Sequence, residues 1–161
     1  MASGTTTSPV SVVIDANVVI ALCAGEPDKL ANAKAKIEEY SGKGCNFYAP
    51  GVIIAECLFV FCRKLSDGVL TPVEHSSAVL GLMKLMRKIN PPPKGDNSLI
   101  ERAEQIRGTL GCSRSADGIY LALAEELNAA VSTELVTFDT GMPNQAARSS
   151  LRMPIVVLPT V

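Results

Sequence analysis

Residues 10–23 read VSVVIDANVVIALC, an apolar stretch that a single charged residue, Asp15, interrupts. Its first half, Val10–Asp15, is short, rich in β-branched residues and preceded by Pro9, a pattern that predicts a buried β-strand. The second half, Asn17–Cys23, stays apolar and is expected to turn into a short helix. A strand that leads at once into a helix indicates the beginning of an α/β fold.

Short apolar runs and helical runs alternate along the rest of the chain. We expect further strands at 45–49, 135–138 and 155–158, and helices at 27–40, 51–65, 71–89, 97–107 and 115–128. Strands that alternate with helices in this way predict an α/β sandwich around a mostly parallel sheet. The chain of 161 residues has the size of one domain, so we expect a flexible tail over 1–9 and a single domain over 10–161.

Four carboxylates stand alone in apolar runs of this chain. Besides Asp15, they are Glu56 in FYAPGVIIAECLFVFC, Asp117 at the start of DGIYLALA and Asp139 at the end of ELVTFD. An ionised carboxylate is costly to bury unless it is paired or binds a cation. Four such residues near the ends of elements predict a shared pocket that holds a divalent metal ion.

The expected fold is compatible with this convergence. Asp15 and Asp139 each fall at the carboxyl end of a predicted strand, where open parallel sheets bind ligands. Glu56 lies about two turns into its helix, among apolar neighbours that indicate an inward face. Simpler roles are also open, because Asp117 can support its helix start, with Ser115 as N-cap, and Asp139 can begin a turn.

Other classes of active site fit the sequence less well. His75 is the only histidine, and no GxSxG nucleophile motif, Walker A loop or GxGxxG fingerprint occurs. A net charge of −1 excludes overall basicity as the means of attracting nucleic acid, although a local basic rim remains open. The basic residues that could form such a rim are Arg63, Lys64, Lys84, Arg87, Lys88, Arg114, Arg148 and Arg152.

The cysteines and the chain start bear on localisation. The five cysteines form no CxxC pair and no Cys/His zinc spacing, and three of them lie in apolar runs, which favours free core thiols and a reducing compartment. The N-terminal stretch lacks a basic and an apolar segment, and no uninterrupted apolar stretch reaches the ~20 residues of a membrane span. We therefore expect a cytoplasmic protein without a membrane segment.

The four acidic motifs, taken together and in this order, resemble those of the PIN-domain nucleases, which include VapC-like toxins. The matching residues are Asp15 with Asn17, Glu56, Asp117 in SRSADGIYLALAEEL, and Asp139 with Thr137. The resemblance runs from about Val12 to Leu158. One departure is Gly118, where the family often has alanine, and we expect it to affect packing rather than chemistry.

The resemblance implies a Rossmann-like α/β/α sandwich, commonly dimeric, in which the acids hold Mg²⁺ or Mn²⁺ and RNA phosphodiester bonds are hydrolysed. On this reading Asp15, Glu56, Asp117 and Asp139 are the catalytic and metal-binding residues, supported by Asn17, Ser115 and Thr137. A homodimer and a small antitoxin protein are the implied partners. Two alternatives stay open: a non-catalytic PIN-like module that binds RNA or protein, and a metal-dependent phosphatase.

Overall fold

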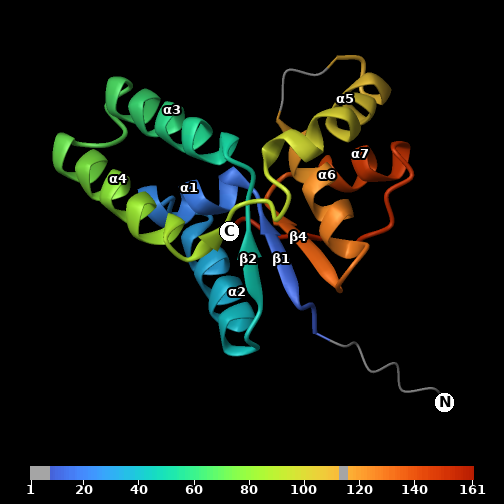
Figure 1. The fold of residues 1–161 in the computed structure, drawn as a ribbon. Coiled ribbons are helices and arrows are strands. Elements are labelled where there is room, and N and C mark those ends of the chain that lie inside the picture. The colour runs from blue at the N-terminus through green and yellow to red at the C-terminus, as the bar shows by residue number, and fades with distance from the viewer. Residues whose placement is uncertain (1–7, 113–115) are drawn as a thin grey trace.

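A parallel β-sheet forms the centre of the computed structural model, which describes residues 8–112 and 116–161 (Figure 1). Its strands are β1 (Ser11–Ile14), β2 (Asn46–Tyr48), β3 (Ile89–Asn90), β4 (Thr133–Thr137) and β5 (Ile155–Val157). Their order is β3-β2-β1-β4-β5, and every neighbouring pair is parallel. The mostly parallel sheet that the sequence predicted is confirmed, and the described strands are all parallel.

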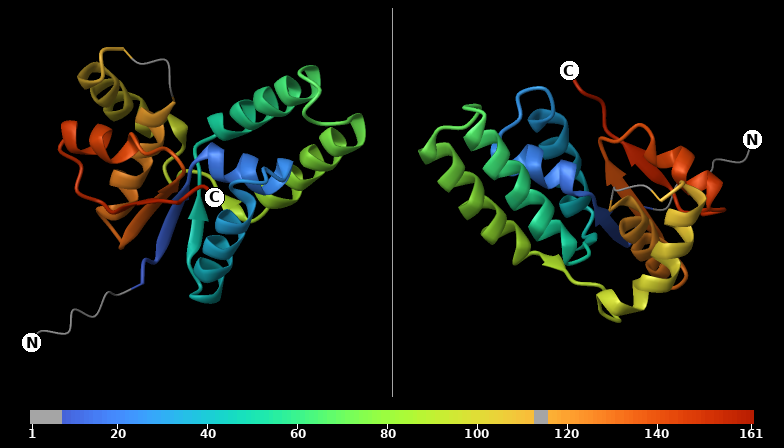
Figure 2. Two further views of the ribbon diagram at one scale, coloured as in Figure 1. Left: turned by 180° about the vertical axis from the view of Figure 1, so that it is seen from behind. Right: turned by 90° about the horizontal axis from the view of Figure 1, so that it is seen from above.

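Helices cover both faces of this sheet, which confirms the α/β/α sandwich. Helices α1–α4 lie on one face, and α5–α7 lie on the other (Figures 1 and 2). The helices are α1 (Ala16–Ala24), α2 (Leu30–Gly42), α3 (Val52–Ser66), α4 (Pro72–Met86), α5 (Ile100–Thr109), α6 (Asp117–Asn128) and α7 (Met142–Arg148), with a 3-10 turn at Asp96–Leu99 before α5.

The core is built around β1, the central strand. Val12, Val13 and Ile14 are at most 1% exposed, because β1 pairs with strands on both sides and has helices on both faces. A strand covered in this way needs apolar side chains at successive positions rather than at alternate ones. The unbroken apolar run that marked this strand in the sequence is the result.

Two elements differ from the sequence-based expectation. The helix predicted to reach about Ile89 ends at Met86, and Ile89–Asn90 forms the edge strand β3. Helix α7 was not predicted, because its seven residues are too few to show a helical period. The predicted start of α4 is confirmed: the Thr71 hydroxyl accepts the Glu74 N–H, and the Glu74 carboxylate accepts the Thr71 N–H.

The five cysteines are free thiols, but two of the three that lie in apolar sequence runs are not fully buried. Cys57 is buried as expected, whereas Cys62 is exposed and Cys23 is only partly covered. Cys62 follows Ile54 and Leu58 at four-residue intervals on α3, and this stripe faces outward, so an apolar sequence context did not imply burial.

Two further expectations concern the N-terminal tail and membrane-spanning segments. Residues 1–7 of the expected tail lie outside the described residues, whereas Pro9 is buried and its carbonyl accepts a hydrogen bond from the Cys45 thiol at 3.0 Å. Among the described residues, no helix has both the length and the apolar character needed to span a membrane.

Candidate active site

The candidate site lies where the strand order reverses, between β1 and β4. From β1 the chain proceeds to β2 on one side, whereas β4 joins β1 on the other side. The crevice at the carboxyl ends of two such strands is the usual ligand site of open parallel sheets. Asp15 directly follows β1, Thr137 ends β4, and Asp139 lies two residues further on.

Asp15 is the buried acid of the site, with 5% of its surface exposed. It occupies the N-cap position of α1, yet its side chain makes no capping hydrogen bond. Instead, its Oδ2 accepts a hydrogen bond from the Thr137 hydroxyl at 2.6 Å. Burial raises the pKa of Asp15 to about 7; the Thr137 hydrogen bond opposes this shift, and the charges of Asp117 and Glu56 add to it.

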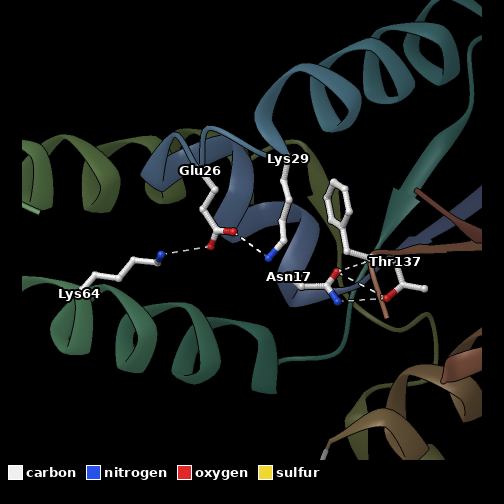
Figure 3. A network of polar contacts seen from close by, with 6 residues as sticks. Asn17, Glu26, Lys29, Lys64 and Thr137 are labelled. Carbon is white, nitrogen blue, oxygen red and sulfur yellow. Dashed lines mark hydrogen bonds and ion pairs between the residues drawn. The ribbon is translucent and has the colours of Figure 1, made fainter. Parts of the chain in front are cut away.

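Asn17 and Thr137 hold the ends of α1 and β4 together (Figure 3). The Asn17 amide donates to the Thr137 hydroxyl at 3.1 Å, and its Oδ1 accepts the Phe138 N–H at 3.1 Å. The same Thr137 hydroxyl oxygen accepts the Asp139 N–H at 2.9 Å. Because Thr137 also donates to Asp15, this network fixes the position of two of the four acids.

Glu56 reaches the site from α3 and is partly buried. The hydroxyl of Tyr120 on α6 donates to Glu56 Oε2 at 2.5 Å. Burial raises the pKa of Glu56 above its usual value, the Tyr120 hydrogen bond opposes the rise, and the charge of Asp117 adds to it. Tyr120 is itself fully buried, so its hydroxyl holds Glu56 from the core side.

Asp117 is the first residue of α6 and is held by the unexpected helix α7. Gln145 Nε2 donates to Asp117 Oδ2 at 2.8 Å, while Gln145 Oε1 is buried and has no hydrogen-bond partner among the described residues. Ala116 occupies the N-cap position without a side-chain cap. Ser115, which was expected there, lies outside the described residues.

Asp139 both begins a turn and lines the same pocket as the other acids. Its Oδ1 accepts the Gly141 N–H at 2.7 Å, which is the turn contact that its sequence context allowed. A carboxylate has a second oxygen, and Asp139 also lines the pocket that contains the other three acids. The turn therefore orients this residue toward the site.

All four acids line one pocket of about 290 Å³. The other lining residues are Ala16, Asn17 and Ile20 on α1, and Phe59 and Val60 on α3. None of the described residues that line the pocket is basic. The negative charge of this pocket is thus not balanced by a lining cation.

The donor set fits a hard divalent cation, because it consists of carboxylate oxygens. The charges of Glu56 and Asp117 both act on Asp15, and a bound cation would relieve this repulsion. Among the described residues, however, no group of three His, Cys, Asp or Glu side chains forms a ready-made metal site. Mg²⁺ commonly retains several water ligands, so one or two direct carboxylate contacts are sufficient for binding.

Ion pairs beside the site connect the turn after α1 to α3 (Figure 3). Glu26 bonds Lys29 at 2.9 Å and Lys64 at 3.3 Å, and its side chain is only 14% exposed. This bridge helps to hold α3, and with it Glu56, against α1. Because Lys64 pairs with Glu26 and Arg63 lies 3.7 Å from Asp67, these two members of the expected basic rim already have acidic partners.

Tyr120 and Gln145 were not identified from the sequence. Tyr120 lies three residues after Asp117 on α6, a spacing that places both on one side of a helix and could have drawn attention to it. Gln145 carried no such signal, because helix α7 itself was not predicted.

Comparison with known protein families places the chain in one of them. The PIN domain family model matches residues 12–147, which is most of the chain. The chain belongs to the PIN-domain family. Members of this family are nucleases. A search of curated protein sequences gives no match.

Solved structures share the fold of this PIN domain at low sequence identity. A chain of VapBC2 from Rickettsia felis, bound to a DNA fragment from their promoter, matches with a TM-score of 0.62 and 11% identity over 91% of this chain and 98% of that chain. FitAcB from Neisseria gonorrhoeae matches with a TM-score of 0.55 and 15% identity over 89% and 95%. FitAB bound to an IR36 DNA fragment matches with a TM-score of 0.54 and 18% identity over 91% and 94%.

Proposed function

We propose that this protein is a Mg²⁺- or Mn²⁺-dependent endoribonuclease that hydrolyses RNA phosphodiester bonds. The observation that carries the proposal is the single pocket into which four different parts of the chain bring Asp15, Glu56, Asp117 and Asp139. Membership of a nuclease family supports phosphodiester hydrolysis as the reaction. The carboxylate donor set supports a hard divalent cation as the cofactor.

The acids and their hydrogen-bond donors have distinct roles in this proposal. A bound divalent ion would polarise the phosphate and lower the pKa of a coordinated water molecule. Asp15, Glu56 and Asp117 would hold that ion, and Asp139 would contact it directly or through water. Tyr120, Thr137 and Gln145 each fix one oxygen of a carboxylate. The second oxygen of Asp15 and of Asp117 is left for the ion, whereas Glu56 would hold the ion through a water molecule that contacts its Oε1.

Glu56 is the residue best placed to accept a proton from the attacking water. It is less buried than Asp15, and its pKa is raised, which brings a carboxylate closer to the basicity that a general base needs. Tyr120 holds Oε2, so Oε1 is the oxygen that would accept the proton. The proton would then be released to solvent from the partly exposed side chain, and the leaving oxygen of the broken P–O bond would take up a proton from water.

We also propose that the protein acts in the cytoplasm as the toxin of a toxin–antitoxin pair and forms a homodimer. The shared fold with chains of VapBC2 and FitAB supports the toxin role. Exposed apolar side chains on α3 and α4 support a protein partner: these are Ile54, Leu58, Leu80 and Met83. Sedimentation of the purified chain measures the dimer, and growth arrest on expression measures toxicity.

Glu56→Gln separates the catalytic proposal from its alternatives. We expect the wild type to cleave RNA with Mg²⁺ or Mn²⁺ and not with chelator, and Glu56→Gln to lose cleavage while its circular dichroism spectrum is unchanged, because the amide keeps the volume but not the charge. RNA binding without cleavage by the wild type would favour the non-catalytic module. Cleavage of small phosphomonoesters instead of RNA would favour the phosphatase.

A further inference from the structure

Phe59 is an exposed aromatic residue on the wall of the acidic pocket. It is 67% exposed, whereas the other three phenylalanines are buried or partly buried. It lies on α3 three residues after Glu56, so the ring and the carboxylate are on neighbouring positions of one helix surface. Single exposed apolar residues are common, and exposure alone carries no argument. Phe59 is distinguished by its position, because it lines the same pocket as the four acids.

The lining of the pocket combines two kinds of side chain. Besides Ala16 and Asn17, it consists of the four carboxylates and the apolar residues Ile20, Phe59 and Val60. A nucleotide combines two matching kinds of group, an anionic phosphate and a flat aromatic base. A phosphate beside the acids would therefore leave its base near an apolar surface that contains an accessible ring.

We propose that Phe59 stacks against the base of a nucleotide next to the scissile phosphate and thereby selects single-stranded RNA. The inference rests on the proposed ribonuclease function. Aromatic side chains bind single-stranded nucleic acids by stacking, because every base has a π-face. In a duplex both faces of a base are covered by its neighbours, so the ring has no surface to meet unless the base is displaced.

A contact of Phe59 with a second protein is the competing use of this ring. Leu58, the residue before it, is also exposed but does not line the pocket. The stripe of Ile54, Leu58 and Cys62 faces away from the acids and offers a separate apolar surface to a protein partner. Phe59 differs from this stripe because it lines the pocket together with the acids, which favours the nucleotide.

The test compares RNA binding by variants made in the inactive Glu56→Gln background. We expect Phe59→Ala and Phe59→Leu to weaken binding of a single-stranded oligoribonucleotide by about five- to 150-fold, the range that stacking on one aromatic ring contributes. Phe59→Tyr should restore binding, since it keeps the ring. Ile100→Ala is the control, because this α5 side chain is 62% exposed and does not line the pocket, and it should leave RNA binding unchanged.

An oligonucleotide of the same length without bases makes the test specific to stacking. Phe59→Ala should bind this backbone as well as the parent does, because the partner of the ring is missing. In the active protein, Phe59→Ala should raise KM for single-stranded RNA more than it lowers kcat. Equal losses for the two oligonucleotides, or rescue by Phe59→Leu, would overturn stacking.

The outcomes also separate this inference from the proposed function. If the wild type cleaves RNA with metal and Phe59→Ala cleaves it equally well, only the stacking role is overturned. If Phe59→Ala changes the sedimentation of the protein but not its RNA binding, the ring belongs to a protein interface and the inference is wrong. If the wild type neither binds nor cleaves RNA, both proposals fail.

Discussion

Asp15 illustrates how a single residue couples folding to the proposed chemistry. Its carboxylate follows a core strand and is almost entirely buried, so the folded protein favours its neutral form. A carboxylic acid that binds a metal ion must lose its proton, and metal binding is therefore expected to strengthen as the pH rises through about 7. The same raised pKa determines how the metal-free protein responds to pH.

The stability of the metal-free protein should fall between about pH 4 and pH 7. The pKa of Asp15 is about 7 in the folded protein and 3.8 as its ordinary value, so in this range the folded state keeps a proton that the unfolded chain has released. The stabilising effect is complete below pH 3.8 and is lost as the pH rises through about 7. Asp15→Asn should remove it and be more stable than the wild type at pH 8 by up to roughly 4 kcal/mol.

Urea unfolding of both proteins at a series of pH values measures this difference. Other acids titrate in both proteins, so the quantity of interest is the difference between the two unfolding free energies at each pH. A difference that stays constant from pH 4 to pH 8 would show that Asp15 keeps an ordinary pKa.

Two buried tyrosines allow the role of Tyr120 to be tested against a matched control. Tyr120 donates to Glu56 at the site, and Tyr40 donates to Glu134 at 2.6 Å outside the pocket, near the start of β4. Each Tyr→Phe change removes one hydrogen bond and should cost about 1 kcal/mol of stability. Only Tyr120→Phe should also reduce metal-dependent cleavage, by roughly tenfold, because Glu56 loses its orientation.

Cleavage rates and thermal melts of the two variants check this expectation. Equal cleavage by both variants would assign Tyr120 a purely structural role.

At the scale of elements, the site depends on a close approach between α5 and α6. A Cβ atom on Gly118 would lie 3.0 Å from the Ala103 carbonyl oxygen, so an alanine there would require α5 or α6 to shift by a few tenths of an ångström. Gly118 is the residue after Asp117. The departure noticed in the sequence, glycine where the family often has alanine, therefore has a packing reason in this chain.

Gly118→Ala should destabilise the protein by about 1–2 kcal/mol, because the shift of α5 or α6 that admits the methyl group costs more than the up to about 1 kcal/mol that helix propensity contributes. Since Asp117 begins α6, we expect weaker metal binding as well. Gly108→Ala on α5 is the control, because a Cβ there meets no atom within 4 Å and helix propensity should stabilise it by up to about 1 kcal/mol. Thermal unfolding measures the stability of the wild type and of both variants. A Gly118→Ala variant as stable as the wild type would contradict the role of Gly118 in helix packing.

The sequence predicted long helices and strands better than short ones. It indicated the four acids but not the residues that donate hydrogen bonds to them. The runs around Asp15 and Asp117 carry strong apolar patterns, so β1 and α6 were predicted close to their observed positions. β3 and α7 are too short to show a period. Gln145 and Tyr120 acquire their roles only through contacts across the fold, and no local pattern contains that information.

At the scale of the whole molecule, the two groups of helices on either side of the sheet each contribute acids. Helix α3 supplies Glu56 from one side and α6 supplies Asp117 from the other, while the strand ends between them supply Asp15 and Asp139 (Figure 1). No single motif forms the site, because its parts come from separate elements of the sandwich. Hydrogen bonds from Thr137, Tyr120 and Gln145 hold three of these acids in place.

A crystal soaked in Mn²⁺ shows whether these acids bind a divalent cation. Crystals should be kept above pH 7, where Asp15 is ionised. We expect an anomalous-scattering peak in the pocket, within about 2.5 Å of an oxygen of Asp15 and of at least one other acid, and we expect the peak to disappear in Asp15→Asn. A saturated crystal with no peak in the pocket, or with a peak that Asp15→Asn retains, would contradict this expectation.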